Sequence, residues 1–439
     1  MKTKLIRVIS IAILAAVMLP FAACSKTAPL LSGKYKLSGD RFKRSGSYMS
    51  EVLTIGQKGS GKCIEEFEIN LNCPEGKDVR LAYRSHIQDA GWYDWSPEGQ
   101  EISHDRFFGI DTVQFMLMGK DACMFDIEYR IAVVGEDWQN WVTNGTMAGV
   151  PEEHRPIEAI EVRLLLKVAY NSATWTITEF ADASGKQGMF YTMYNNVDGT
   201  LIVVDGGYPE NTTQARSVIN LLGGRVDHWF LTHFDADHAS VFNEIYADPD
   251  GIEIGEVYVT PLDYDYYLGF AVDRWWDTPE VYETFLSQTE GDERIHYLSR
   301  DDEFEIDGLN IEVFNAFDDI VVGAGSPDVA NFSSLVFRIE GEQDSILFTG
   351  DVYGDMLMLL YDMYGDRLAS RYVQPGHHGN NWVSPDCWSV VNAEVMFIDG
   401  PQWLTEGEQY SAKELISWCH VNGIMTYEFA SAPNWVAFN

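Results

Sequence analysis

Four ionisable side chains stand close together in the segment THFDADHAS, which begins at Thr232. They are His233, Asp235, Asp237 and His238. In an extended loop, residues two apart face the same side, so His233 and Asp235 can reach one metal ion. Asp237 and His238 follow where the chain begins to turn, which lets them reach a second ion nearby. The spacing therefore predicts ligands for two metals.

Two later segments offer the same residue types. SILFTGD reads as a strand that ends at Asp351, a carboxylate able to bridge two cations, and RYVQPGHHGNN reads as a strand that ends at His377 and His378. Three strand ends that present His or Asp on tight turns are hard to explain by packing. Together they predict a metal centre.

The surrounding elements alternate between strands and helices. TLIVVDGG, from Thr200 to Gly207, is a buried strand that ends in a sharp turn, and Thr213 to Gly223 reads as a helix with a glycine stop. RVDHWFLTH is the next strand and leads into the first cluster, and the following helix is expected to begin near Ala239.

The HxDxDH loop, the TGD turn and the GHHG turn resemble the metallo-β-lactamase superfamily, over roughly Thr174 to Asn439. The resemblance implies an αββα sandwich with two metals at the edge of its sheets. It also implies six metal ligands, namely His233, Asp235, Asp237, His238, Asp351 and His377. Which histidine of the GHHG pair ligates stays open in the sequence; His377 is favoured, with His378 placed over the substrate.

The chain departs from the commonest family pattern at two places. Asp235 stands where the loop usually has a second histidine, and the usual histidine ahead of the TGD turn is missing. His296 lies between them in a strand-like run and is interpreted as structural. Instead, NFSSLVFRIE places Asn331 and Ser333 before the TGD strand. This combination is similar to the extracellular hydrolase domain of the ComEC competence proteins, which implies a phosphodiester substrate.

The expected cofactors are two divalent metal ions. Zinc is the first expectation and manganese the alternative, because a carboxylate-rich ligand set is harder than an all-histidine one. Two cations lower the pKa of a shared water toward neutrality, and the resulting hydroxide would attack the substrate, with Asp237 and His378 as catalytic residues. The sequence thus predicts a phosphodiesterase or nuclease. The alternatives are a lactonase or β-lactamase-type hydrolase of the same fold, and a non-catalytic surface-binding protein.

An internal repeat precedes this region. Similar segments start at Ile64, Ile110 and Ile157, at intervals of 46 and 47 residues. Each ends in alternating apolar residues, which indicates half-buried strands. Two WxxW pairs recur 46 residues apart, Trp92 with Trp95 and Trp138 with Trp141.

At these residues the segment resembles the clostridial hydrophobic-W repeats, which implies attachment to a cell-envelope polymer or a surface glycan. Trp92 and Trp138 are expected to be buried and to pack in the core. Trp95 and Trp141 are expected to be more exposed and available for sugar stacking.

The N-terminus predicts export. Lys2, Lys4 and Arg7 precede an apolar run from Val8 to Ala23, which is short for a membrane span and typical of a signal-peptide core. FAAC resembles the bacterial lipobox, except that Phe21 replaces the usual leucine, so Cys24 is expected to be lipidated. The protein is then predicted to lie outside the cell, anchored to the outer face of the membrane.

Length and composition support a folded chain of more than one domain, and the β repeats together with the resemblance imply class α+β. Three parts are predicted: a lipoprotein signal peptide at 1–24, β repeats at 33–168 and a hydrolase domain at 172–439. A fragment from about Ala169 onward should fold and hydrolyse alone. Lys and Arg number 30 against 67 Asp and Glu, a net charge of −37, which argues against broad gripping of nucleic acid. Six cysteines show no CxxC pair, although Cys63 and Cys73 could form a disulfide.

Overall fold

The structure is a computed structural model that describes residues 30–439, apart from 50, 104–108, 152, 168–171, 272–273 and 275. The expected signal segment 1–24, with Cys24, lies outside the described residues. Within them, no helix has the length and apolar character needed to cross a membrane. The five cysteines in this part of the chain are free, so Cys63 and Cys73 are not bonded to each other.

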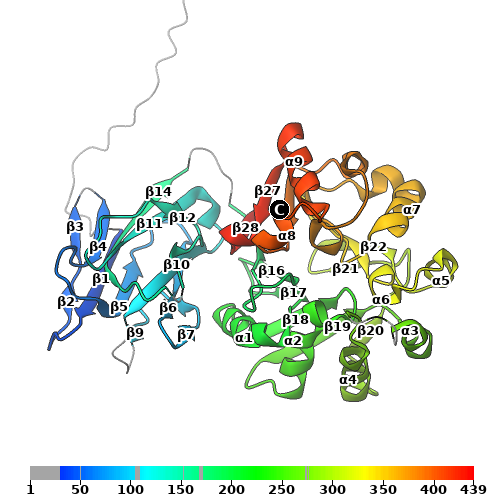
Figure 1. Cartoon of the computed structure of the whole chain (residues 1–439), viewed down its shortest axis with the longest axis horizontal. Helices are drawn as coiled ribbons and strands as arrows, with labels where there is room; N and C mark the ends of the chain where they lie inside the picture. The colour runs from blue at the N-terminus through cyan, green and yellow to red at the C-terminus, as the bar shows by residue number, and fades with distance from the viewer. Residues whose placement is uncertain are drawn as a thin grey trace, which may run out of the picture.

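The N-terminal half consists of three antiparallel sheets around one core (Figure 1). A four-stranded sheet has the order β2 (Arg44–Ser45), β1 (Leu31–Leu37), β5 (Ile64–Leu71), β9 (Ile102–Ser103). A second sheet has the order β13 (Ala148–Gly149), β10 (Ile110–Met118), β6 (Arg80–Ile87), β7 (Gly91–Trp92), with β8 (Ser96–Pro97) also on β6. A third has the order β12 (Val142–Thr143), β11 (Phe125–Val133), β14 (Ile157–Leu166), β4 (Val52–Gly56), β3 (Ser47–Met49). The predicted β-rich region is therefore present.

The exposure of the repeated tryptophans differs from what the sequence predicted. Trp95 is the most buried of the four, at 4% exposure, whereas Trp92, Trp138 and Trp141 are each only partly buried. The expectation that Trp95 is exposed was wrong because helix α1 (Thr212–Leu221) of the C-terminal half covers it, and the backbone N–H of Trp95 donates to Ser217 Oγ at 2.6 Å. Contacts so distant in sequence leave no local signal.

The C-terminal half is built on two seven-stranded mixed sheets. The first has the order β20 (Ile295–Tyr297), β19 (Glu253–Val259), β18 (Arg225–Leu231), β17 (Leu201–Asp205), β16 (Phe190–Asn195), β15 (Trp175–Glu179), β28 (Asn434–Phe438). The second has the order β21 (Glu303–Ile306), β22 (Leu309–Asn315), β23 (Val336–Glu340), β24 (Ser345–Phe348), β25 (Tyr372–Gln374), β26 (Val395–Ile398), β27 (Met425–Glu428).

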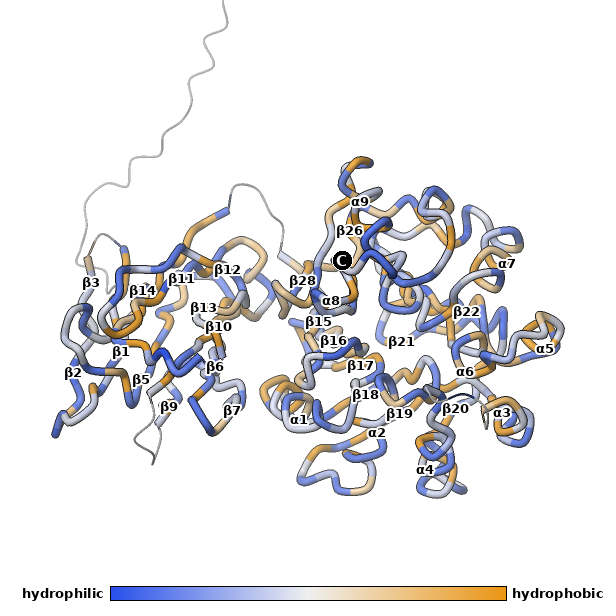
Figure 2. The backbone as a smooth tube through the Cα atoms, viewed as in Figure 1, coloured by the Kyte–Doolittle hydropathy of each residue, from blue (hydrophilic) through white to orange (hydrophobic). Residues whose placement is uncertain are grey.

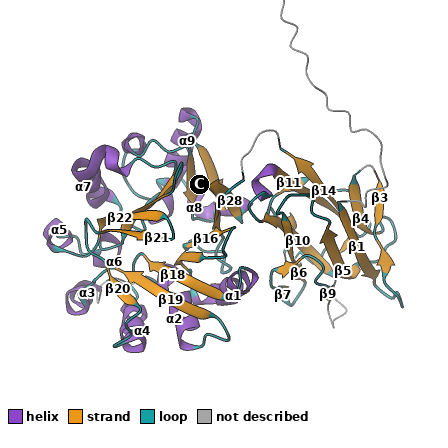
Figure 3. Ribbon diagram, turned by 180° about the vertical axis from the view of Figure 1, so that it is seen from behind, coloured by secondary structure: helices purple, strands orange, loops and turns teal. Residues whose placement is uncertain are grey.

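The two sheets pack face to face and helices cover both outer faces (Figure 3). One face carries α1, α2 (Ala236–Ala247), α3 (Tyr264–Ala271) and α4 (Pro279–Thr289). The other carries α5 (Asp319–Ala324), α7 (Gly354–Tyr364) and α9 (Ala412–Asn422). Helix α6 (Val329–Phe332) lies against both α3 and α5, and α8 (Gln402–Thr405) contacts α9. These helices carry both hydrophobic and hydrophilic residues, as elements covering a sheet must (Figure 2). The α+β class and the αββα sandwich are confirmed.

The parallel strands position the loops that matter for function. In the first sheet β17 to β20 are parallel, and in the second β24 to β27 are parallel. Ligands of such sheets bind in the loops beyond the carboxyl ends of the strands. Helix α2 begins at Ala236, three residues before the predicted Ala239, so Asp237 and His238 lie in its first turn.

Candidate metal centre

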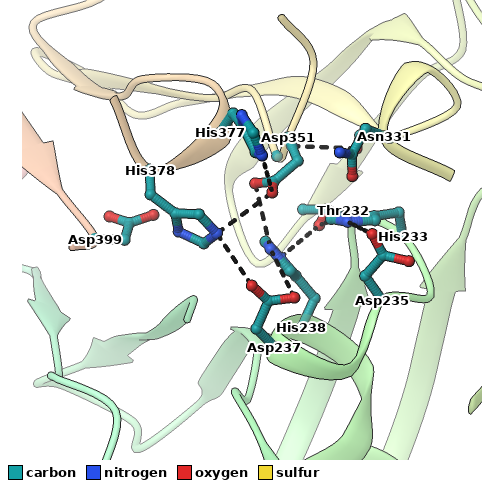
Figure 4. Close-up of polar contacts among 12 residues, drawn as sticks. Thr232, His233, Asp235, Asp237, His238, Asn331, Asp351, His377, His378 and Asp399 are labelled. Atoms are coloured by element: carbon teal, nitrogen blue, oxygen red, sulfur yellow. Dashed lines mark hydrogen bonds and ion pairs between the residues drawn. The ribbon is translucent and has the colours of Figure 1, made fainter. Parts of the chain in front are cut away.

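Every predicted ligand follows the carboxyl end of a strand or lies in the turn after it. His233 and Asp235 come after β18, and Asp237 and His238 open α2. Asp351 follows β24 from the second sheet, and His377 and His378 follow β25 in a short 3₁₀ turn. Figure 4 shows their side chains converging on one place between the two sheets.

Two glycines permit this convergence. A side chain on Gly376 would place its Cβ 1.9 Å from the carbonyl oxygen of Val352. Gly350 has a φ of +50°, and a Cβ added there would lie only 2.8 and 3.0 Å from the Cβ atoms of Ser334 and Thr232. The TGD and PGHH turns can therefore approach each other only with glycine at these positions. His377 and His378 also have positive φ, of 54° and 57°, which non-glycine residues rarely adopt.

The Asp351 carboxylate lies at the middle of the cluster. Its Oδ1 is 3.2 Å from His238 Nε2, and its Oδ2 is 3.3 Å from His378 Nε2. His378 Nε2 is also 3.3 Å from Asp237 Oδ2, while His238 Nε2 is 4.0 Å from Asp237 Oδ1. This arrangement joins residues from both sheets.

The remaining pair lies beside this group. His233 Nε2 is 3.6 Å from Asp235 Oδ2, and the rings of His233 and His238 have centroids 4.1 Å apart. Two sets of ligand atoms are each mutually within 4.8 Å, one from His233, His238 and Asp351 and the other from Asp237, His238 and His378. Asp235, which the sequence expects beside His233 on the first ion, belongs to neither set, and the expected assignment of ligands to two ions stays a prediction.

Of the two adjacent histidines, His378 and not His377 belongs to a ligand set. His378 is buried, whereas His377 keeps 29% of its side chain exposed and has its Nε2 4.0 Å from Asp351 Oδ2. His377 Nδ1 lies 2.9 Å from the Asn380 carbonyl oxygen, and its ring stacks on Tyr353. The geometry thus exchanges the roles that the sequence favoured for the pair.

The residues present fit divalent metal ions. His233 Nε2, His238 Nε2, His378 Nε2 and Asp351 Oδ1 are buried without a hydrogen-bond partner in the described chain. Such atoms are costly unless a further group binds them, and imidazole and carboxylate donors suit zinc or manganese. These side chains could therefore hold metal ions at the meeting point of the two sheets.

The charges within the cluster interact strongly. Burial alone would lower the pKa of His238, but the carboxylates of Asp351 and Asp205 raise it well above its ordinary value. Burial would likewise raise the pKa of Asp351, yet His378 and His238 hold it well below its usual range. The pKa of His378 is raised to about 10, against the effect of burial, mainly by Asp351.

Asp205 is a functional candidate that the sequence did not single out. It ends β17 at a φ of 54°, and its Oδ2 lies 2.7 Å from His238 Nδ1. Thr232 donates to both of its oxygens, from the backbone N–H at 2.7 Å and the hydroxyl at 2.6 Å. A carboxylate that accepts from the far ring nitrogen fixes the orientation of a ligating histidine. The sharp VVDGG turn was the only sequence signal.

Two more side chains border the cluster. Gln187 Nε2 donates to Asp237 Oδ2 at 3.2 Å. Asp399 follows β26 near His378 (Figure 4), accepts from the Tyr191 hydroxyl, and has its pKa raised to about 6 by burial. Neither was predicted.

The other residues that the sequence highlighted lie beside or away from the cluster. Asn331 Nδ2 is 3.4 Å from Asp328 Oδ2, and the Ser333 hydroxyl donates to Ala330 O. The neighbouring Ser334 accepts from Asp351 N–H at 3.2 Å, so it, rather than Ser333, supports the TGD turn. His296 lies on β20 against Glu256, outside both ligand sets.

Comparisons with known proteins agree with this architecture. Residues 190–355 match the family described as metallo-beta-lactamase superfamily, and residues 133–165 match clostridial hydrophobic W. No curated protein matches the chain.

Several solved structures are similar in part. The metallo-beta-lactamase fold protein YhfI from Bacillus subtilis shares 9% identity at a TM-score of 0.40, covering 60% of this chain and 99% of that one. The metallo hydrolase Igni18 from Ignicoccus hospitalis shares 12% identity at a TM-score of 0.35, covering 60% and 99%. A diphosphatase of the PhnP family shares 11% identity at a TM-score of 0.34, covering 60% and 98%. By the family models, residues 190–355 of the chain are a metallo-β-lactamase superfamily region, and residues 133–165 ahead of it are a clostridial hydrophobic W segment.

Proposed function

We propose that this chain is a cell-surface, metal-dependent phosphodiesterase. One observation carries the proposal, the convergence of buried, unpartnered imidazole and carboxylate atoms around Asp351 at the carboxyl ends of strands from both sheets. The ligands would be His233 and Asp235 for one ion, and Asp237, His238 and His378 for the other, with Asp351 between them. Two divalent ions held there would supply Lewis-acid activation of water and of the scissile group.

The chain's own residues would bind and orient the substrate. A carbonyl oxygen can only accept a hydrogen bond, so His377 Nδ1 carries a hydrogen toward Asn380 O and leaves Nε2 free. Being partly exposed and 4.0 Å from Asp351, His377 Nε2 is suited to exchange a proton with the substrate or its leaving group. Asp237 Oδ2, which contacts Gln187 and His378, would orient the attacking water.

A phosphodiester is favoured over a lactone or a β-lactam by the ligand set. Asp235 replaces a histidine, and harder carboxylate ligands suit metals that bind phosphate oxygens. The net charge of −37 would repel a long polyanion, so affinity should depend on the metals and on few basic groups. Lys186 is one such group; its ammonium lies 4.4 Å from the ring centroid of Tyr208, next to Gln187.

Attachment to the outer face of the membrane through lipidated Cys24 is part of the same proposal. It is supported by the short apolar run and the FAAC segment. Such a location would give the enzyme access to nucleic acid or phosphodiester-linked polymers outside the cell.

A substrate panel tests the proposed reaction. Purified protein loaded with zinc or manganese is assayed in parallel against a generic aryl phosphodiester, single-stranded DNA, a lactone and a β-lactam. Turnover of the phosphodiester is expected. Turnover of the lactone or the lactam with none of either diester would contradict the phosphodiesterase and favour a lactonase or β-lactamase-type hydrolase.

A further inference from the structure

The β-rich half contains two matching clusters in which an arginine lies over two tryptophan rings. The first ladder is Arg84, Trp92 and Trp95, and the second ladder is Arg130, Trp138 and Trp141. The guanidinium carbon of Arg84 is 4.3 and 4.9 Å from its two ring centroids, and that of Arg130 is 5.0 and 4.6 Å from its own.

The backbone around the ladders repeats as well. Tyr93 N–H donates to Ser85 O at 2.9 Å, and 46 residues later Gln139 N–H donates to Ile131 O at 2.9 Å. Trp138 forms an antiparallel bridge with Ala132, as Trp92 does with the matching His86. The second ladder therefore presents the same atoms as the first.

The first ladder is occupied by helix α1 of the C-terminal half. Arg84 Nη1 donates to Gln214 Oε1 at 2.6 Å, and the backbone N–H of Trp95 donates to Ser217 Oγ at 2.6 Å. Arg84 also donates through Nε to Gln114 Oε1 at 2.7 Å. The ladder thus recognises two oxygen acceptors that lie three residues apart on one helix, where they share a face.

The second ladder has no such cover. Trp138 and Trp141 are partly exposed, and Arg130 donates only to Glu161, which replaces Gln114 in the repeat. In the part of the chain that the structure describes, Arg130 Nη1 and the backbone N–H of Trp141 have no hydrogen-bond partner. They match the two atoms that hold α1.

The cross-strand residue pair beside the first ladder is apolar, and the matching pair beside the second ladder is charged. Beside the first ladder, Ala82 pairs across strands with Met116, and both pack in the core cluster that contains Val218 of α1. Glu128 and Arg163 take these places in the second unit, where they pair across strands and form an ion pair. A ligand of the second ladder should therefore be polar where α1 is apolar.

We propose that the second ladder binds a helix of a partner protein that carries two oxygen acceptors three residues apart, such as Gln and Ser, flanked by polar residues. The charges of Arg130 and Arg163 are balanced by those of Glu128 and Glu161, so the partner need not be strongly charged. Guanidinium groups of both Arg130 and Arg163 already lie over the Trp141 ring, which leaves less open ring face for stacking on a sugar. This inference is independent of the proposed phosphodiesterase.

Two labelled helical peptides test the proposal on the full chain by fluorescence anisotropy. One copies residues 209–224, and the other carries Val218→Gln and Leu222→Gln within that sequence. The unaltered chain is expected to bind the polar peptide about tenfold more tightly than the natural one, a difference of about 1.4 kcal/mol. The double variant Glu128→Ala/Arg163→Met, which restores the apolar pair of the first unit, should reverse this preference.

Trp141→Ala should abolish binding of both peptides, while Trp403→Ala, at an exposed tryptophan on α8, should leave it intact. Circular dichroism checks that each variant is folded. Failure of the unaltered chain to bind either peptide, or binding that survives Trp141→Ala, would overturn the proposal. Binding of soluble peptidoglycan fragments that is lost in Trp141→Ala, with no peptide binding, would assign the surface to a glycan instead.

Discussion

His377 and His378 are adjacent in the chain but have different surroundings. His378 Nε2 lies 3.3 Å from both Asp237 and Asp351, whereas His377 is stacked on Tyr353 and partly open to solvent. Sequence could identify the pair because GHHG follows a strand end. It could not assign the roles, because left-handed backbone at both residues decides which ring turns inward. Asp205 was missed for a similar reason, since its contact with His238 spans 33 positions in the chain.

Substitution of each histidine separates the two roles. His378→Gln should lose metal and, with it, nearly all turnover. His377→Gln should keep its metal while kcat falls by about 10²- to 10⁴-fold, the usual contribution of a proton-transfer group. Elemental analysis of the purified variants, set beside diester kinetics, distinguishes them. Metal loss in His377→Gln with full retention in His378→Gln would restore the opposite assignment.

Metal uptake should depend on pH in a defined direction. In metal-free protein the pKa values of His238 and His378 are raised, that of His378 to about 10, so both imidazoles carry protons at neutral pH. A metal must displace these protons. Affinity for zinc should therefore rise with pH from neutrality toward pH 10, with proton release visible by calorimetry in buffers of different ionisation enthalpy. Affinity that is flat or falls over this range would contradict the assignment.

At the scale of elements, the sequence predicted most of what positions the site. The strands expected before Asp351 and His377 are present, although β24 ends at Phe348 and β25 at Gln374. The loop after β18 carries the first cluster, because buried apolar runs ending in glycine-rich turns leave a clear local pattern. The docking of α1 on Arg84 and Trp95 could not be predicted. Its contacts join residues 122 and 130 positions apart, and nothing near Trp95 indicates a partner.

The two ladders give a matched pair of stability predictions. Arg84 is partly buried and hydrogen-bonded across the halves, so Arg84→Ala should lower the free energy of unfolding by about 1.5–3 kcal/mol. Arg130→Ala removes only a partly exposed ion pair and should cost about 0–1 kcal/mol. Denaturant unfolding of both variants measures the difference. Equal costs would mean that the first ladder does not hold the halves together.

At the scale of the whole molecule, the chain combines an acidic hydrolase domain with a β-rich half that contacts it through α1 and β28. Gln114 Nε2 donates to Ala432 O at 3.0 Å, so the halves share polar as well as apolar contacts. The expectation that a fragment from about Ala169 onward works alone stays a prediction, and these contacts argue that such a fragment would expose apolar surface around Val218. The net charge of −37 is a property of the whole chain that the sequence gives directly, whereas export stays a prediction.

The whole chain is predicted to be attached to the membrane through Cys24. Protein expressed with its own N-terminus in a bacterial host should fractionate with membranes, because two acyl chains on Cys24 give stable anchoring. Cys24→Ala should appear in the soluble or secreted fraction, while Cys73→Ala, at an exposed free cysteine, serves as the control. A Cys24→Ala protein that stays in the membrane fraction would rule out the lipid anchor.

A metal titration of the full chain that records phosphodiester hydrolysis tests most directly whether two metals bound around Asp351 catalyse this reaction. Metal-free protein is mixed with increasing zinc or manganese, and turnover is measured at each ratio for the unaltered chain, for Asp351→Ala and for Asp362→Ala, an exposed aspartate of α7. Activity is expected to rise to a plateau at about two equivalents of metal, as a two-metal site requires. Asp351→Ala should bind at least one metal fewer and stay inactive, while Asp362→Ala should bind metal and hydrolyse the diester like the unaltered chain. Full activity without metal, or two metals and normal turnover in Asp351→Ala, would contradict this two-metal mechanism.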